Sequence, residues 1–258
     1  MRKNIFTIFL AMLFIIPNCL AQGEATLPQT PEDTFWSNVK NDFISPFNNL
    51  TGKKVLLGGL GLATGLVLTR EVTSYPLQEE TAKKRPMGSS SKYGDMAGQM
   101  YPSILYFVGM EAYSYFADNP EAHEFAIVML KSTIYASLVT DVLKKTVQEP
   151  RPSDPSDKES FPSAHATRAF AFAATVNELH GSSWGIPAYI MSTGVAYSRM
   201  NDNRHYVHDV LAGAAIGASY GISIAQRYKN KKENQKSNSE FAVIPTGDGA
   251  AATFSYSF

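Results

Sequence analysis

The stretch SRMNDNRHYVHD, residues 198–209, places two arginines, two histidines and two aspartates between apolar segments. His205 and Asp209 stand four positions apart at the start of a predicted helix, so both side chains lie on one face of it. A carboxylate there accepts the imidazole Nδ1–H and leaves Nε2 with a free lone pair. This spacing indicates a histidine prepared as a nucleophile or base, although a surface capping pair is the plainer interpretation. His208 is the rival, but it is adjacent to Asp209 and is expected to point away from it.

Residues 159–170, ESFPSAHATRAF, combine a helix start with another histidine. Ser163 follows a proline and is a good N-cap, and His165 falls in the first turn of the predicted helix. The free N–H groups and the dipole of such a helix end attract an anion. Plain capping explains the same residues, so this segment decides nothing by itself.

Residues 144–152, KKTVQEPRP, add positive charge. Lys144 ends a predicted helix, and prolines on both sides of Arg151 restrict the backbone and so aim its side chain. Positive charge at a helix C-terminus usually compensates the helix dipole. Together with Arg199 and the two histidines, however, these cations form the set needed to move a phosphoryl group without a metal. The cations neutralise phosphate oxygens, one histidine attacks phosphorus, and the other protonates the leaving oxygen.

These residues, in this order, resemble the motifs of the type 2 phosphatidic acid phosphatase superfamily, which includes bacterial class A acid phosphatases and vanadium haloperoxidases. The resemblance rests on Lys144 with six residues before Arg151-Pro152, on Pro162-Ser163-Ala164-His165, and on Ser198-Arg199 with five residues before His205 and three more before Asp209. Ala164 stands where the family often has glycine. The motifs span residues 144–209, and the helical pattern from about 100 to 228 fits the family's helical core. Residues 1–98 and 229–258 are not covered.

The resemblance implies a role for each residue of the motifs. His205 would form a phosphohistidine, Asp209 would orient it, and His165 would act first as general acid and then as base. The residues implied to hold the phosphate are Lys144, Arg151, Ser163, Arg199 and, through its backbone N–H, Ala164. No metal or other cofactor is implied, although vanadate can mimic phosphate in such a site.

The motif recognises only the phosphate, so the substrate stays open at this stage. A lipid phosphate or lipid pyrophosphate is the first expectation, because apolar and aromatic segments surround the motifs. A soluble acid phosphatase of broad specificity is the alternative, and a vanadium-dependent haloperoxidase is a further one. Zinc bound by His165, His205, His208 and Asp209 is opposed by the three nearby cations. A non-enzymatic interaction module is disfavoured because no residue needed for catalysis is missing.

Hydrophobic periodicity predicts an all-α protein, a helical bundle of the phosphatidic acid phosphatase type 2 kind. The predicted helices cover residues 101–117, 121–147, 164–180, 186–200 and 206–228. Residues 78–100 are predicted to form a loop, and residues 241–245 and 250–258 a small hairpin around TGDG. The predicted domains are a signal peptide (1–21), an N-terminal extension with one apolar helix (22–98), a catalytic helical domain (99–228), and a polar linker with the hairpin (229–258).

The apolar run KVLLGGLGLATGLVLT, residues 54–69, is shorter than a comfortable membrane span. We expect a buried or membrane-touching helix in which Gly61 and Gly65 permit close helix contact. The mean hydropathy of −0.15 argues against a protein with many spans. A membrane surface is nevertheless an expected partner, whereas the balance of 23 basic and 23 acidic residues does not suggest nucleic-acid binding.

The N-terminus predicts export. Arg2 and Lys3 precede the uncharged run 5–16, and the residues around Cys19 resemble a cleavage site. An uncleaved anchor or lipidation of Cys19 are the alternatives. Cys19 is the only cysteine, so the mature chain would rely on its core without disulfides. The expected location is the periplasm or the outer membrane, and activity is expected to peak on the acidic side of neutral, between the two histidine ionisations.

Overall fold

The computed structural model describes residues 35–237, 239–246 and 249–256. The chain divides into two compact units, Met1–Lys40 and Asn41–Phe258. The boundary predicted between residues 98 and 99 lies within the second unit. The predicted signal peptide and Cys19 lie outside the described residues.

The protein is built from helices, as the periodicity predicts. The helices are α2 (Phe35–Phe43), α3 (Ser45–Asn48), α4 (Leu50–Leu68), α5 (Ser74–Lys84), the 3-10 turn η2 (Gly88–Ser90), α6 (Ser91–Ala97), α7 (Tyr101–Ala117), α8 (Pro120–Val147), α9 (Ala164–His180), α10 (Ser182–Asn201) and α11 (Val207–Ser237). The helices predicted at 101–117 and 164–180 have those bounds in the structure, and α11 runs further than predicted. Proline at N1 or N2 of α7 and α8 suits a helix start, because the first N–H groups have no intrahelical partner.

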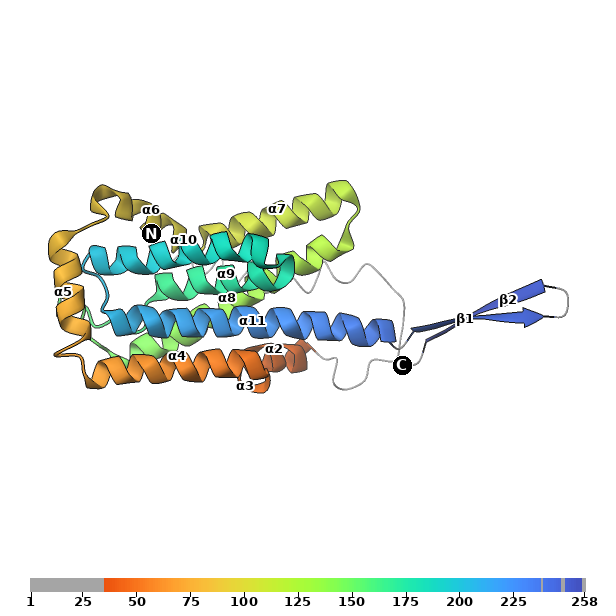
Figure 1. The fold of residues 1–258 in the computed structure, drawn as a ribbon, viewed down its shortest axis with the longest axis horizontal. Coiled ribbons are helices and arrows are strands. Elements are labelled where there is room, and N and C mark those ends of the chain that lie inside the picture. Colours follow the sequence, from red (N-terminus) through yellow and green to blue (C-terminus); the bar gives the residue numbers. More distant parts are fainter. Residues whose placement is uncertain (1–34, 238, 247–248, 257–258) are drawn as a thin grey trace. The chain divides into compact units, whose positions relative to one another are not determined.

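The long helices of the second unit lie alongside one another (Figure 1). α11 packs against α9, α4 and α8, and α9 also packs against α10 and α8. The core between them contains Met129, Ala171, Ile216 and Tyr220. α5 and α6 cross one end of this bundle and pack against α10.

Small residues let α11 approach its neighbours closely. A Cβ added at Gly217 would lie within 3.0 Å of the Thr167 carbonyl of α9, and one added at Gly59 would lie within 3.0 Å of Ala215. The prediction for Gly61 and Gly65 is wrong, because no described neighbour lies within 4 Å of a Cβ at either position. In α11, a Cβ at Gly213, Gly217 or Gly221 would likewise meet a backbone carbonyl of α9 or of its N-cap, so these glycines allow backbone contact between the two helices.

The loop predicted at residues 78–100 is also wrong, because α5, η2 and α6 occupy most of it. The glycine, serine and proline content of the segment is typical of loops, but tertiary packing overrides it. α6 lies so close to α10 that a Cβ at Gly94 would lie within 3.0 Å of Ser198. α5 ends where Arg85 adopts a left-handed conformation with a φ of 44°.

At the C-terminal end, β1 (Ser239–Thr246) pairs with β2 (Gly249–Tyr256) as an antiparallel hairpin. Its register pairs Ser239 with Tyr256 and Thr246 with Gly249. The connection between the strands falls within the predicted TGDG turn.

Three helices within the described residues have the length and composition of a membrane span, namely Leu50–Leu68, Pro120–Val147 and Val207–Asn234. The share of these segments that is buried inside the protein differs greatly, from 17% for the first to 83% for the third. The apolar run for which a buried or membrane-touching helix is expected, residues 54–69, falls almost wholly within the first of these helices. These helices indicate a membrane protein.

Candidate active site

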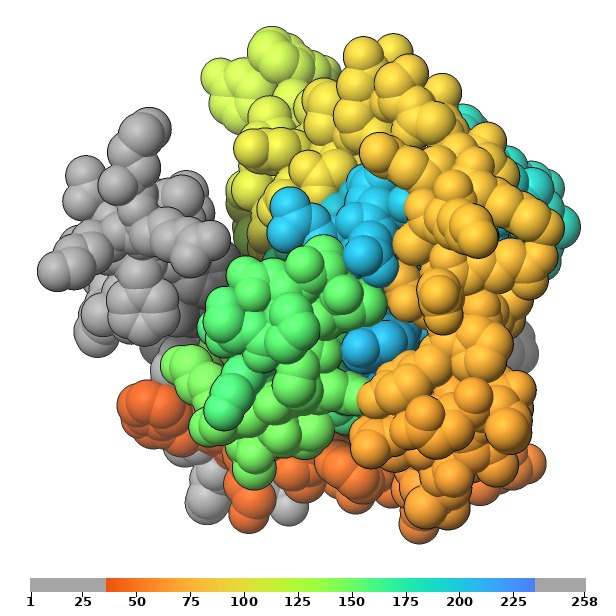
Figure 2. Space-filling model, turned by 90° about the vertical axis from the view of Figure 1, so that its left-hand side faces the viewer, coloured from red at the N-terminus to blue at the C-terminus, as the bar shows by residue number. Residues whose placement is uncertain are grey.

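Three segments distant in sequence meet at the end of the bundle that α5 and α6 cross. They are the loop after α8, the N-terminus of α9 and the connection between α10 and α11. Figure 2 looks at this end, where the light-blue connection between α10 and α11 lies in a recess between the green loop and the gold-to-yellow segments of α5 and α6. The backbone N–H of Ser163 donates to the carbonyl of Asp209 over 3.0 Å, which joins the start of α9 to the start of α11.

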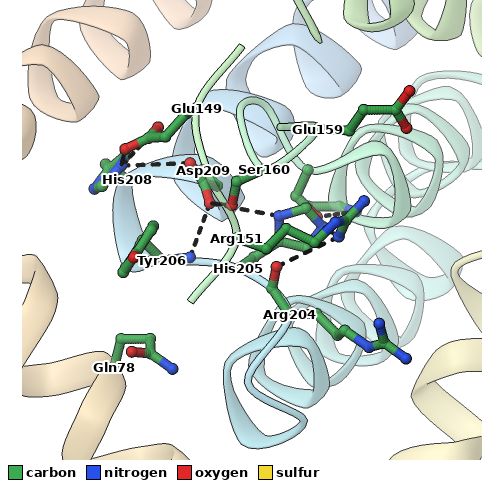
Figure 3. A network of polar contacts seen from close by, with 12 residues as sticks. Gln78, Glu149, Arg151, Glu159, Ser160, Arg204, His205, Tyr206, His208 and Asp209 are labelled. Carbon is green, nitrogen blue, oxygen red and sulfur yellow. Dashed lines mark hydrogen bonds and ion pairs between the residues drawn. The ribbon is translucent and has the colours of Figure 1, made fainter. Parts of the chain in front are cut away.

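His205 lies just before α11 and is 3% exposed. Its Nε2 accepts from Nη1 of Arg151 at 3.2 Å, and its Nδ1 lies 3.4 Å from Oδ2 of Asp209 (Figure 3). An arginine can only donate, so the Nε2 atom holds the lone pair and the proton of the neutral ring is on Nδ1. This is the tautomer that the four-residue spacing predicts.

Asp209 caps α11 as well as facing His205. Its Oδ2 accepts from the backbone N–H of Tyr206 at 2.8 Å and from the Ser160 hydroxyl at 2.5 Å. A carboxylate at the third helical position that reaches back in this way is a capping contact. Asp209 thus both faces the imidazole, as a catalytic pair requires, and caps the helix, as the plainer interpretation predicts. The pair is buried, however, and does not lie on the surface. Within the described chain, neither Nδ1 of His205 nor Oδ1 of Asp209 has a hydrogen-bond partner.

The three predicted cations reach this site with partners of their own. Nζ of Lys144 donates to the carbonyl of Glu159 and, at 3.4 Å, to that of Ser160. Nε of Arg151 pairs with Asp157 at 2.7 Å. The guanidinium of Arg199 pairs with Asp95 and Asp202. The two arginines are thus held in place by carboxylates before any anion binds.

His165 lies in the first turn of α9, behind the N-cap Ser163. Its Nε2 is 3.1 Å from Oδ1 of Asp95 and 3.1 Å from the side-chain nitrogen of Gln99. The same Asp95 oxygen contacts Arg199. Ala164 begins the helix, so its N–H is one of the unpaired donors of a helix start.

The two imidazoles are neutral in the ligand-free protein at neutral pH. Burial lowers the pKa of His205 to about 4, and Asp209 opposes that shift. Burial, together with the charges of Arg168 and Arg199, lowers the pKa of His165 to about 3. A bound dianion would offset the charge of the arginines, so the pKa of His165 should rise when phosphate occupies the site.

His208 does not point away from Asp209 as expected, because its Nε2 lies 3.4 Å from Oδ1 of that residue. The same nitrogen lies 2.9 Å from Glu149, and Nδ1 lies 2.7 Å from the Ser74 hydroxyl. With both ring nitrogens engaged, His208 cannot serve as the nucleophile. Glu149, His208 and Asp209 each offer an atom within 4.8 Å of the others, a spacing that a metal ion could use, but this set does not include His165 or His205.

Several residues at this site were not predicted. Asp95 and Gln99 come from the segment predicted as a loop and lie outside the recognised motifs. Glu149 lies between Lys144 and Arg151, and Ser160 lies just before Phe161 and Pro162, so their only signal was proximity in sequence to the motif residues. They lie at the site because buried polar atoms need hydrogen-bond partners. Asp209 is paired with Ser160 and His208 with Glu149, and both partners come from neighbouring segments of the fold.

Part of the chain matches a known family, and the chain is similar to several known proteins. Residues 125–233 match the model of the PAP2 superfamily. The chain is 24% identical over 232 residues to a lipid A 1-phosphatase of Porphyromonas gingivalis, covering 86% of this chain and 50% of the relative. It is 34% identical over 98 residues to a decaprenylphosphoryl-5-phosphoribose phosphatase of Mycobacterium tuberculosis, covering 34% of this chain and 53% of the relative. The chain thus spans about half the length of these curated relatives.

A solved structure has a similar fold. A transmembrane PAP2-type phosphatidylglycerolphosphate phosphatase from Bacillus subtilis aligns with a TM-score of 0.53 and 20% identity, covering 73% of this chain and 97% of that one. The site residues from Lys144 to Asp209 all fall inside the segment that the family model matches. Residues 125–233 are therefore identified as a PAP2 superfamily domain, the family that the sequence motifs resemble.

Proposed function

We propose that this protein is a metal-independent phosphatase that hydrolyses a lipid phosphate through a phosphohistidine intermediate. One observation carries the proposal, namely the line of contacts from Arg151 through Nε2 of His205 to Asp209, with His165 and Arg199 in the same site. It places the Nε2 lone pair, which can attack phosphorus, beside the arginines that would bind the phosphate oxygens.

In the first step, Nε2 of His205 attacks phosphorus while the bond to the ester oxygen breaks. Arg151 already contacts Nε2, so it is placed to bind an oxygen of the phosphoryl group that replaces it there. Asp209 stabilises the positive charge that develops on the ring, and its long 3.4 Å contact is expected to shorten at that point. His165 gives its proton to the leaving oxygen.

In the second step, water attacks the phosphohistidine and the P–N bond breaks. His165, now neutral, takes a proton from that water, and His205 returns to its starting form. Lys144 adds a further positive charge near His205. No step in this sequence needs a metal ion.

Two features support a lipid substrate at a membrane. The first is the set of three helices with the length and composition of a membrane span. The second is that the curated relatives are named as phosphatases of lipid A and of a decaprenyl compound. The predicted export signal would place the site on the periplasmic or outer side of a bacterial envelope.

The test is phosphate release by the full chain in detergent, with lipid phosphates, isoprenoid phosphates and water-soluble esters compared. We expect release from a lipid phosphate, insensitivity to EDTA, and no release by His205→Ala. Asp209→Asn should keep a small residual activity, because it loses orientation but not the nucleophile. An alkaline quench with labelled substrate should trap label on the wild type but not on His205→Ala.

Other outcomes would replace the proposal. Turnover of soluble esters alone would favour the broad-specificity acid phosphatase. Halide oxidation with vanadate in the absence of phosphatase activity would favour the haloperoxidase. Loss of activity in EDTA would point to the group of Glu149, His208 and Asp209 as a metal site.

A further inference from the structure

The helix α6 is built into the catalytic site. A Cβ at Gly98, just after α6, would lie within 3.0 Å of the His165 side chain. Nε of Arg168 donates to the Gly98 carbonyl at 2.9 Å, and the Gln99 side chain contacts Nε2 of His165. Such close contacts fix the position of α6 relative to His165, and therefore fix the position of the Asp95 side chain that α6 carries.

The carboxylate of Asp95 stands at the boundary between the site and solvent. Its Oδ1 contacts both Arg199 and Nε2 of His165, while 52% of the side chain is exposed. These are the contacts that a leaving oxygen of the substrate would make, because Arg199 would bind the phosphate and His165 would protonate that oxygen. Asp95 therefore faces the side of the site from which the leaving group departs.

We propose that Asp95 is a specificity-determining residue that favours substrates with an uncharged leaving group, so that the enzyme prefers a lipid monophosphate to a lipid pyrophosphate. This inference rests on the function proposed above. In a monophosphate the leaving oxygen is bonded to an uncharged carbon. In a pyrophosphate the same oxygen is bonded to a second phosphoryl group, whose negative charge would lie beside the Asp95 carboxylate.

The other charges near this point do not cancel that repulsion. Arg199 also serves the transferred phosphoryl group, so once substrate binds it no longer compensates Asp95 alone. Arg168 and His205 are the remaining charged or titratable groups that act on His165, and Arg168 is mostly buried in α9. A like-charge contact at a half-exposed site costs enough to change a rate by about tenfold.

Asp202 provides a matched control. It also pairs with Arg199, at 3.3 Å, but its other side-chain partners are Arg85 and Asn201, and among the described residues it forms no hydrogen bond or ion pair with His165. Asp202→Asn therefore removes a carboxylate from Arg199 without changing the charge beside the general acid. If Asp95 acted only by occupying Arg199, both variants would have the same effect.

The experiment uses the full chain in detergent with farnesyl monophosphate and farnesyl pyrophosphate, two substrates with the same lipid. Initial rates are followed by separating the products, because hydrolysis of the pyrophosphate yields the monophosphate. We expect wild type to prefer the monophosphate and Asp95→Asn to raise kcat/KM for the pyrophosphate about tenfold. Asp202→Asn should leave the ratio of the two kcat/KM values unchanged. Thermal unfolding of each variant checks that it folds.

The outcomes separate this inference from the proposed function. If wild type releases phosphate from neither substrate, the proposed function fails and the inference falls with it. If wild type is active but Asp95→Asn does not raise kcat/KM for the pyrophosphate, only the inference fails. If Asp95→Asn only lowered kcat/KM for the monophosphate, Asp95 would merely support His165 as an acid. If Asp202→Asn raised kcat/KM for the pyrophosphate as much as Asp95→Asn does, the effect would act through Arg199 in general. Either result overturns the role of Asp95 in discriminating against a charged leaving group.

Discussion

His205 is a polar side chain buried where an imidazolium would be costly, yet the proposed mechanism requires its ring to become positively charged. The contact with Asp209 satisfies both conditions, because the carboxylate stabilises the imidazolium once the ring becomes charged. In the resting protein the burial dominates, and it lowers the pKa of His205 to about 4. The titration of His205 should therefore affect the pH dependence of the free energy of unfolding as well as that of the activity.

We predict that acid destabilises the protein through His205. Between pH 6.5 and about 4, the unfolded chain binds a proton at this ring that the folded chain does not bind, so the free energy of unfolding falls as the pH falls through that window. The contribution is fully present above pH 6.5, and its loss by pH 4 amounts to about 3 kcal/mol.

The measurement is the Tm of wild type and of His205→Gln at several pH values in one detergent. Wild type should lose more Tm than the variant between pH 6.5 and 4.5, because the variant lacks the titrating ring. Comparing the two cancels the other groups that titrate in this range. Parallel curves would show that His205 titrates normally in the folded protein.

At the residue scale, sequence reasoning located the residues whose spacing is fixed by a helix or a proline. His205 with Asp209 is such a case: His205 precedes α11, but the contact of Asp209 with the Tyr206 N–H turns the chain there so that the two side chains come within 3.4 Å. The relation of His208 to Asp209 was mispredicted, because side chains at the first turn turn back toward the helix start. Asp95 could not be found, because its contacts with Arg199 and His165 depend on how α6 packs and not on any local pattern.

At the scale of elements, the contact between α9 and α11 sets the position of the site. Ser163 and Asp209, at the starts of these helices, are joined by a hydrogen bond of 3.0 Å. Both helices must approach closely for that bond to form, and Gly217 allows it where a Cβ would meet the Thr167 carbonyl. Periodicity predicted both helices well, but it could not show which glycines lie in the contact.

We predict that Gly217→Ala lowers stability and that Gly61→Ala does not. The added methyl at position 217 would overlap a backbone carbonyl, which cannot rotate away, so the cost should be about 1–3 kcal/mol. At position 61 the methyl meets open space in the described structure, and alanine has the higher helix propensity.

Thermal unfolding and phosphate release would be measured for both variants. Gly217→Ala should show a lower Tm together with reduced activity, because the starts of α9 and α11 would separate. Gly61→Ala should behave as wild type or be slightly more stable. The reverse order of stabilities would mean that Gly61, and not Gly217, lies in a close helix contact.

At the scale of the whole molecule, the average hydropathy was misleading. The mean of −0.15 combines apolar helices with polar segments at their ends, such as the run KNKKENQKSNSE after the apolar part of α11. A span is a local property of about 20 residues, so an average over the chain cannot exclude it. The helical class, by contrast, was predictable because each long helix carries its own period.

We predict that the protein is integral to a membrane and that α4 faces lipid. Only 17% of this helix is buried inside the protein, and Leu57 and Leu62 are more than half exposed along it. In water, such a continuous apolar face would be unfavourable, whereas in a bilayer it lies in a matching solvent.

The full chain should therefore stay in the membrane pellet after washing with alkaline carbonate and should enter solution with detergent. Leu62→Lys, which places a charge on the lipid side, should reduce the amount of protein in the membrane, whereas Leu62→Ile should not. Release of the wild-type chain by carbonate would support the soluble phosphatase instead, and it would require another partner to cover the leucines of α4.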